Sequence, residues 1–238
     1  MTNINFCAVI VNTDNYMYFF YDDNYAFGID AAEPNYLLEL CDKKLEHMKV
    51  YDKHEISMLK KISKRELLFS LTTHKHWDHS NGDEYLLSKN VPVYKHKNIF
   101  HLQIINQHNF TILCVFTPCH TTDHVCYVVN DKYCATGDFI FKIGCGCFFE
   151  GNSVDFIKSF KELDKQTDEN VIFLYGHDYF RNNKQFAATK RFYTEEEDKL
   201  LLSKTFLNKK EEKALNPFLS TTDPVAIQKL REEKNQFK

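Results

Sequence analysis

Apolar and aromatic residues dominate three short runs near the start of the chain, Phe6–Val11, Tyr16–Tyr21 and Tyr25–Asp30. Clusters of Asn and Asp, which favour turns, separate the runs. The pattern predicts three consecutive short strands. A fourth run, Glu66–Leu71, has the character of a buried strand and leads directly into a polar segment.

Helical periodicity begins after Pro34, a residue well suited to a first helical turn. Apolar residues near helical spacing continue from Leu37 to Met48 and predict a helix. The Lys-rich segment Lys43–Arg65 is expected to continue as helix or loop. It has two interpretations, a basic binding surface or a solvated helix face, and its interspersed acidic residues favour the second. A further helix is predicted at Ser80–Leu87.

Alternation of strand-like and helix-like segments continues downstream. The amphipathic segment from Val154 to Leu163 predicts a helix. After about residue 180 the chain becomes helical in character, and Thr194 with Glu197 has the spacing of a capping box. We therefore expect a catalytic domain at 1–180 and a helical C-terminal substrate-binding subdomain at 181–238. Within the expected catalytic domain, downstream of residue 90, the predicted strands are Val91–Tyr94, Phe110–Phe116, Val125–Asn130, Tyr133–Thr136 and Val171–Tyr175.

Composition narrows the functional classes. The 238 residues are 43% hydrophobic and 26% charged, with a net charge of −3, which does not suggest a nucleic-acid or membrane partner. We find no secretory signal and no apolar run of about 18 residues, so we expect a cytoplasmic protein whose eight cysteines are reduced. Cys145 and Cys147 form a C-x-C pair. A thiolate metal site is one interpretation, but without a C-x-x-C partner a structural role is favoured.

Histidine and aspartate gather where predicted strands end. The segment after Glu66–Leu71 reads H-K-H-W-D-H, and three later strand ends carry C-H, G-D and G-H. Functional side chains often lie where rigid strands give way to loops. Neutral imidazole and carboxylate suit Zn²⁺ or Fe²⁺. The strand ends therefore predict a metal centre formed by His74, His76, Asp78, His79, His120, Asp138 and His177.

This ligand set is large enough for two divalent metals. His74 and His76 are two residues apart and point to the same side of an extended backbone, so they can share an ion. Asp78 and His79 lie past a turn and can serve a second ion. A carboxylate can bridge ions about 3.5–4 Å apart, and Asp138 is the natural bridge. The expected sets are His74, His76 and His120 for one metal and Asp78, His79 and His177 for the other.

Two such metals would share a water and lower its pKa to near 7, which gives a hydroxide nucleophile at neutral pH. Asp78 and Asp138 are the expected catalytic carboxylates beside it. Zn²⁺ is the first expectation, and Fe or Mn also suits the ligands. Asp30 is either a turn residue or a partner that orients a ligand histidine. For His124 a structural role is favoured over that of a further ligand.

The motif T-H-K-H-W-D-H resembles the signature of the metallo-β-lactamase superfamily, and most of the chain is similar to the glyoxalase II branch. The resemblance implies an α/β fold, an αββα sandwich with a small helical C-terminal subdomain. It also implies hydrolysis of S-D-lactoylglutathione to D-lactate and glutathione in methylglyoxal detoxification. The matching segments are Thr73–His79, Pro118–Thr121, His124–Tyr127, Thr136–Asp138, Gly144–Gly146 with Phe148 and Glu150–Gly151, Gly176–Tyr179, Asn216–Phe218, Thr222–Pro224 and Arg231–Lys238.

By motif position, the resemblance implies that Tyr179, Arg231 and Lys234 contact glutathione, whose two carboxylates suit cationic side chains. Cys147 stands where the family usually has Lys or Arg, and Phe149 stands where Tyr is common. Both remain expected substrate contacts, with one positive charge fewer. The expected partner is a small glutathione thioester, without nucleic acid or membrane, and we expect a monomer.

Two other functions are compatible with this resemblance. A related glutathione-linked enzyme such as a persulfide dioxygenase uses one iron and need not keep every ligand of a second metal. A non-catalytic metal-binding relative would tend to lose ligands. The complete set of seven disfavours both. A nucleic-acid-processing relative is more remote still, because the chain has no large basic surface.

Overall fold

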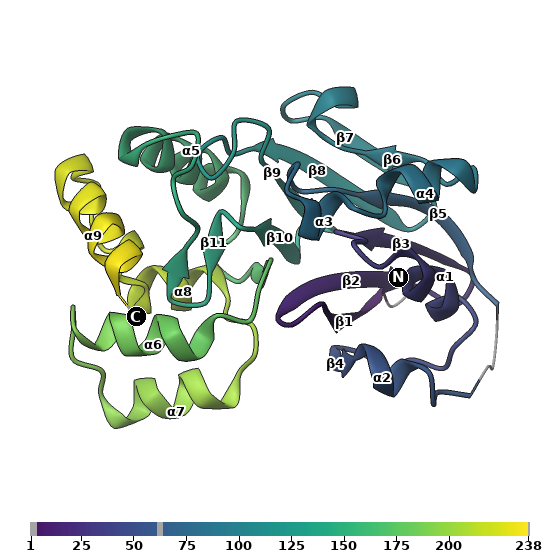
Figure 1. Ribbon diagram of the computed structural model, residues 1–238, viewed down its shortest axis with the longest axis horizontal. Helices are drawn as coiled ribbons and strands as arrows, with labels where there is room; N and C mark the ends of the chain where they lie inside the picture. Colours follow the sequence, from purple (N-terminus) through teal and green to yellow (C-terminus); the bar gives the residue numbers. More distant parts are fainter. Residues whose placement is uncertain (1–3, 61–63, 238) are drawn as a thin grey trace. The chain divides into compact units, whose positions relative to one another are not determined.

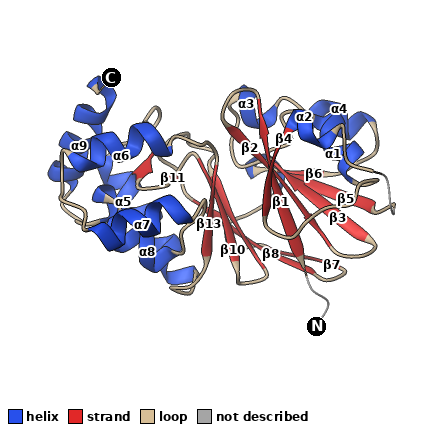
Figure 2. Cartoon of the chain, turned by 90° about the horizontal axis from the view of Figure 1, so that it is seen from below, coloured by secondary structure: helices blue, strands red, loops and turns tan. Residues whose placement is uncertain are grey.

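The computed structural model describes residues 4–60 and 64–237, and the chain forms two compact units, Met1–Cys114 and Val115–Lys238. Each unit combines strands with helices (Figures 1 and 2), so the chain is of the α/β class. The expected boundary near residue 180 falls within the second unit and stays a prediction.

A six-stranded mixed sheet forms the centre of the first unit, in the order β4-β1-β2-β3-β5-β6. The first three strands form an antiparallel meander. β4 runs parallel to β1, β5 runs parallel to β3, and β6 runs parallel to β5. The five strands predicted in this region are confirmed, and β4 is an additional strand. The bounds are β1 Asn5–Val11, β2 Asn15–Tyr21, β3 Tyr25–Ile29, β4 Lys49–Asp52, β5 Glu66–Leu71 and β6 Val93–Tyr94.

Side chains on both faces of this sheet are buried, which explains why β2 reads as a continuous apolar run. One face packs against α1 (Pro34–Leu40) and α4 (Asp83–Ser88) through a cluster that includes Val9, Phe19 and Leu86. On the other face, the Phe27 ring stacks between Phe20 and Phe69 with centroid distances of 5.0 and 4.9 Å. Each buried ring contributes roughly 1.5–3 kcal/mol, so this aromatic row anchors the strands that lead into the polar segment.

Segment 43–65 follows the expectation of helix or loop in part, because its described residues form turns and a short helix but also a strand. α1 ends at Leu40, and the later residues form β4 and the short α2 (Lys53–Ile56); residues 61–63 lie outside the described part. β4 arises because Val50 and Tyr51 pair with β1, the outer strand of the meander, and this tertiary pairing overrides local helical periodicity. The segment Ser80–Leu87 is likewise divided between α3 (Trp77–Ser80) and α4.

Gly82 lies at the junction between these two helices. A Cβ atom there would lie 1.9 Å from the carbonyl oxygen of Ala31, so a side chain cannot be accommodated.

Downstream, the unit adds the 3₁₀ turn η1 (His96–Asn98) and β7 (Ile104–Gln107), a strand that the sequence pattern missed. β7 pairs antiparallel with β8 (Phe110–Phe116), in which the boundary between the units falls.

In the second unit, β10 (Tyr133–Gly137) pairs antiparallel with β9 (Val125–Val129) and parallel with β13 (Ile172–Tyr175). The connection from β10 to β13 contains a small hairpin, β11 (Ile140–Phe141) and β12 (Gly144–Cys145), followed by α5 (Ser153–Gln166). The predicted helix is thus confirmed. It begins where the Asn152 side chain accepts a hydrogen bond from the amide of Val154 at 2.8 Å.

Helices dominate the chain after β13, as expected from the sequence. The capping box of α7 (Glu195–Ser203) is confirmed, because Thr194 and Glu197 exchange backbone-to-side-chain hydrogen bonds of 2.9 and 3.2 Å. Among the described residues, no helix is both long and apolar enough to cross a membrane. The elements are α6 Phe180–Ala188, α7 Glu195–Ser203, α8 Lys209–Leu215, η2 Pro217–Leu219 and α9 Pro224–Gln236, and α9 contacts α5.

Candidate metal centre and adjoining pocket

Asp30 organises the polar loop of the first unit from the end of β3. Its backbone is left-handed, with φ of 54°, a conformation that Asp tolerates better than most residues. Its carboxylate accepts hydrogen bonds from the Thr73 amide at 2.7 Å and the Thr73 hydroxyl at 2.8 Å, and it lies 2.9 Å from Nδ1 of His79. Asp30 is therefore both the turn residue and the histidine partner that the sequence left as alternatives.

The four predicted ligands of this unit lie close together after β5. Nε2 of buried His74 is 2.9 Å from Nδ1 of His76, and Nε2 of His79 is 3.7 Å from Oδ2 of Asp78. Asn15, which the sequence did not single out, donates to the Asp78 carboxylate at 2.9 Å. Because Asp30 engages Nδ1 of His79, the opposite ring nitrogen is oriented toward Asp78.

Asp138 is the central carboxylate of the second unit. It follows the irregular end of β10, where Gly137 has a φ of 47°. Its Oδ2 atom lies 3.4 Å from Nε2 of His120 and 3.4 Å from Nε2 of His177. The three side chains are nearly buried.

These two distances exceed ordinary hydrogen bonds but match shared metal coordination. Two donors about 2.1 Å from one tetrahedral ion lie about 3.4 Å apart. Nδ1 of His120 donates to the carbonyl of Cys147 at 2.8 Å, which leaves Nε2 with a lone pair for a metal. The donor set therefore fits divalent metal ions, and the position of Asp138 between two histidines suits a bridging carboxylate.

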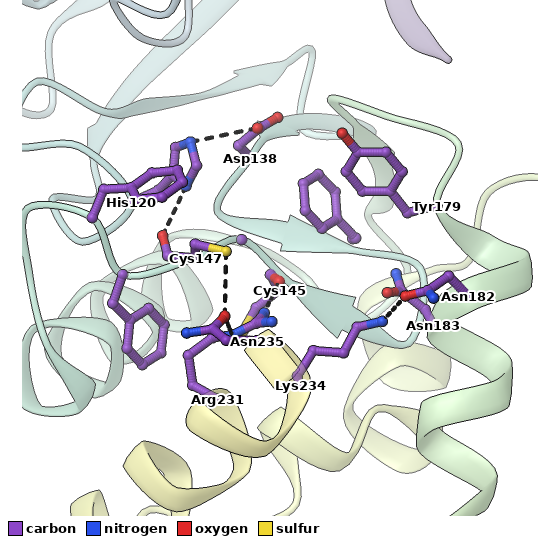
Figure 3. Close-up of a pocket in the computed structure, with 14 residues that line it drawn as sticks. His120, Asp138, Cys145, Cys147, Tyr179, Asn182, Asn183, Arg231, Lys234 and Asn235 are labelled. Carbon is purple, nitrogen blue, oxygen red and sulfur yellow. Dashed lines mark hydrogen bonds and ion pairs between the residues drawn. The ribbon is translucent and has the colours of Figure 1, made fainter. Parts of the chain in front are cut away.

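A pocket of about 580 Å³ opens beside these ligands within the second unit (Figure 3). All five expected substrate contacts lie in its wall. The Tyr179 ring stacks on His177 with centroids 4.5 Å apart, and Phe149, 66% exposed, lies 5.1 Å from the His120 ring. The lining residues are His120, Asp138, Phe141, Cys145, Gly146, Cys147, Phe148, Phe149, Tyr179, Asn182, Asn183, Arg231, Lys234 and Asn235.

Two cations on α9 give the pocket its charge. The Arg231 guanidinium donates to the Cys145 carbonyl at 2.6 Å and to Asn235 at 3.0 Å, while the Lys234 ammonium donates to Asn182. Burial lowers the pKa of Lys234 to about 8, and the nearby charge of Arg231 acts in the same direction. A pair of desolvated cations is suited to bind carboxylates.

Sequence reasoning missed the asparagines of this wall. Asn182 lies three residues after Tyr179 at the start of α6, and Asn235 lies four residues after Arg231 on α9. Residues at these helical spacings share a face. The spacing could have identified both residues once the neighbouring substrate contacts had been chosen.

Comparison with known proteins places this geometry in a family. No family model matches the chain. A probable hydroxyacylglutathione hydrolase of Encephalitozoon cuniculi is 37% identical over 239 residues, covering 94% of each chain. This chain belongs to the hydroxyacylglutathione hydrolase family. A hydroxyacylglutathione hydrolase of Dictyostelium discoideum is 29% identical and covers 93% of this chain and 82% of its own.

Solved structures agree on the fold of this family member. ETHE1 from Myxococcus xanthus has a TM-score of 0.65 at 20% identity and covers 93% of this chain and 86% of its own. A metallo-β-lactamase from Staphylococcus aureus has a TM-score of 0.67 at 16% identity and covers 97% of this chain and 67% of its own. The predicted metallo-β-lactamase fold is thus confirmed.

Proposed function

We propose that this hydroxyacylglutathione hydrolase family member hydrolyses S-D-lactoylglutathione and related 2-hydroxyacyl thioesters to the hydroxy acid and glutathione, the second step of methylglyoxal detoxification. One observation carries the proposal: a single pocket is lined both by candidate metal ligands, His120 and Asp138, and by the cations Arg231 and Lys234, which suit carboxylates. A glutathione thioester carries its reactive carbonyl on the sulfur of the central cysteine and carboxylates on the two terminal residues, so it has a counterpart for both groups of side chains.

Two divalent metals are proposed, with Zn²⁺ first and Fe or Mn also suited to the donors. His74, His76 and His120 would hold one ion, Asp78, His79 and His177 the other, and Asp138 would join them. When bound, such metals polarise a carbonyl and supply an activated water at neutral pH.

The chain's own residues then have separate tasks. Asp30 fixes the His79 ring, and the Cys147 carbonyl fixes the His120 ring, so both present Nε2. Arg231 and Lys234 would anchor the glutathione carboxylates and place the thioester at the opposite side of the pocket. Tyr179, Phe149 and Cys147 would line the path between these ends. The substrate partner is a small molecule, and a monomer suffices for this site.

An assay of metal-loaded protein with S-D-lactoylglutathione tests the proposal, with thiol release as the readout. We expect turnover well above the buffer rate and release of D-lactate. A rate equal to that of buffer would contradict it and favour a non-catalytic metal-binding relative. One bound iron with oxygen uptake on glutathione persulfide would favour a persulfide dioxygenase instead.

A further inference from the structure

The turn of the β11–β12 hairpin contains a strained residue. Ile143 has a φ of 49° and a fully buried side chain. A β-branched residue is rarely found in this left-handed region, and such strain persists only where surrounding structure enforces it. The side chains that contact this hairpin are therefore the groups that keep Ile143 in its strained conformation.

Glu212 of α8 is the residue that engages the strained amide. Its side chain is fully buried, and its two carboxylate oxygens lie 3.1 and 3.2 Å from the amide nitrogen of Ile143, which donates to them. The Tyr175 hydroxyl and the Asn216 amide also donate to this carboxylate, at 2.7 and 2.9 Å. The carboxylate is thus a buried acceptor for three separate donors.

Asn216 and Asn183 extend the same support along the hairpin. The Asn216 side-chain amide donates to the Gly144 carbonyl at 2.9 Å and to the Phe141 carbonyl at 3.4 Å. Asn183 of α6 donates to the Lys142 carbonyl at 3.2 Å. Side chains from α6 and from the region of α8 therefore hold the backbone polar groups of the turn at four successive residues, 141–144.

The chain leaves this hairpin directly into the pocket wall. A Cβ atom on Gly146 would lie 1.9 Å from the Asp138 carbonyl oxygen and 2.8 Å from Nδ1 of His120, so the segment packs tightly against both residues. The carbonyl of Cys147 accepts from the same His120 nitrogen, and the carbonyl of Cys145 accepts from Arg231. A displacement of the hairpin would move the contacts of a candidate metal ligand and of a candidate substrate cation together.

We propose that Glu212, acting with Asn216, is a positioning residue: it holds the β11–β12 hairpin in its strained turn and thereby sets the Cys145–Cys147 wall against His120 and Arg231. Glu212 does not line the pocket and acts only through the hairpin. The inference rests on the proposed function only for the identity of the ligand that the pocket binds.

The test compares Glu212→Gln with Lys209→Gln. Glutamine keeps one acceptor oxygen but turns its amide toward the donors of the network, so the support of the hairpin is broken. Lys209 is a buried charged residue of the same helix that pairs with Asp164 at 3.0 Å and donates to the Asp164 carbonyl at 2.9 Å, away from the pocket. Lys209→Gln therefore controls for the general effect of losing a buried charged side chain on α8, because Lys209 contacts Asp164 rather than the hairpin.

Two readouts are measured at pH 8, above the pKa of Glu212 at about 7 so that its side chain is ionised, under conditions where both variants remain folded by circular dichroism. Amide hydrogen exchange at residues 142–147 should accelerate in Glu212→Gln and stay at the wild-type rate in Lys209→Gln. The Kd for S-methylglutathione, which has no thioester to hydrolyse, should rise about tenfold in Glu212→Gln and change less than about twofold in Lys209→Gln.

Wild-type exchange rates at 142–147 in Glu212→Gln would overturn the inference, as would equal effects in the two variants. If the wild-type protein does not bind S-methylglutathione, the proposed substrate class fails and the exchange comparison alone decides the role of Glu212. If Glu212→Gln does not fold, Asn216→Ser takes its place, with the same two readouts and the same deciding outcomes.

Discussion

Lys234 is a pocket residue whose charge changes at mildly alkaline pH. Its partners are Arg231 on its own helix, the thiols Cys145 and Cys147 across the pocket, and Asn182 on α6. Because its pKa lies at about 8, the ammonium loses its proton as pH rises through that value. Substrate carboxylates would then meet one cation fewer.

A pH profile tests this charge. We expect kcat/KM for S-D-lactoylglutathione to fall as pH rises through about 8, with the loss mainly in KM, since the charge binds a remote part of the substrate. Lys234→Met should raise KM about tenfold at pH 7 and remove this limb of the profile. Lys229→Met, an exposed residue of the same helix outside the pocket wall, is the control. An unchanged KM in Lys234→Met would refute the assignment.

Cys147 is a neutral residue at a pocket position where the resemblance described above leads us to expect Lys or Arg. Its thiol contacts the Asn235 carboxamide oxygen at 3.4 Å inside the pocket. Cys147→Arg places a cation there and should lower KM for glutathione thioesters severalfold. Cys147→Met, similar in polarity and larger in volume, controls for bulk. Equal KM values in the two variants would mean that the missing charge has no consequence.

At the scale of elements, the end of β3 connects the sheet of the first unit to the candidate metal centre. We expect Asp30→Asn to weaken metal affinity by about 10–100-fold, because the contact that orients His79 loses its charge. Competition with a chromophoric chelator measures this effect. Asp22→Asn is the matched control, because Asp22 also accepts backbone amides, from Asn24 and Tyr25, and its other oxygen accepts from Asn109, none of which is a predicted ligand. Wild-type metal affinity in Asp30→Asn would contradict the assignment.

Because Glu212 is buried, we also expect the free energy of unfolding to depend on pH through the packing of α8 against the hairpin. Burial raises the pKa of its carboxyl from 4.5 to about 7. The folded protein therefore keeps a proton that the unfolded chain releases, and stability falls as pH rises from about 4.5 to about 7. The difference amounts to at most roughly 3 kcal/mol. Urea unfolding at pH 5 and pH 7 should show this fall in the wild type but not in Glu212→Gln; parallel pH dependence in both would contradict the prediction.

Strong periodicity was enough to predict most strands and the helix α5, because their apolar residues form complete buried faces. β4 and β7 could not be predicted, since short strands such as Lys49–Asp52 depend on pairing with a distant edge. The candidate metal ligands could be proposed from the sequence because metal chemistry restricts such ligands to a few residue types, and here these residues lie at strand ends. Glu212 was not recognisable, because its role depends on a turn at Ile143 that lies 69 residues away in the sequence.

At the scale of the whole molecule, each of the two units contributes part of the proposed ligand set. The first unit brings together His74, His76, Asp78 and His79, and the second brings together His120, Asp138 and His177. A chain with this complete set is expected to bind two metals and to lose them when the bridging carboxylate is neutralised. The family relationship identifies the reaction class, while metal content and substrate turnover test the site itself.

The most direct measurement determines metal content by mass spectrometry and thiol release from S-D-lactoylglutathione on the same samples of wild type and Asp138→Asn. We predict close to two metals per chain and rapid turnover for the wild type. Asp138→Asn should lose metal and at least about 100-fold in kcat together. Full metal occupancy with full activity in Asp138→Asn would contradict the account.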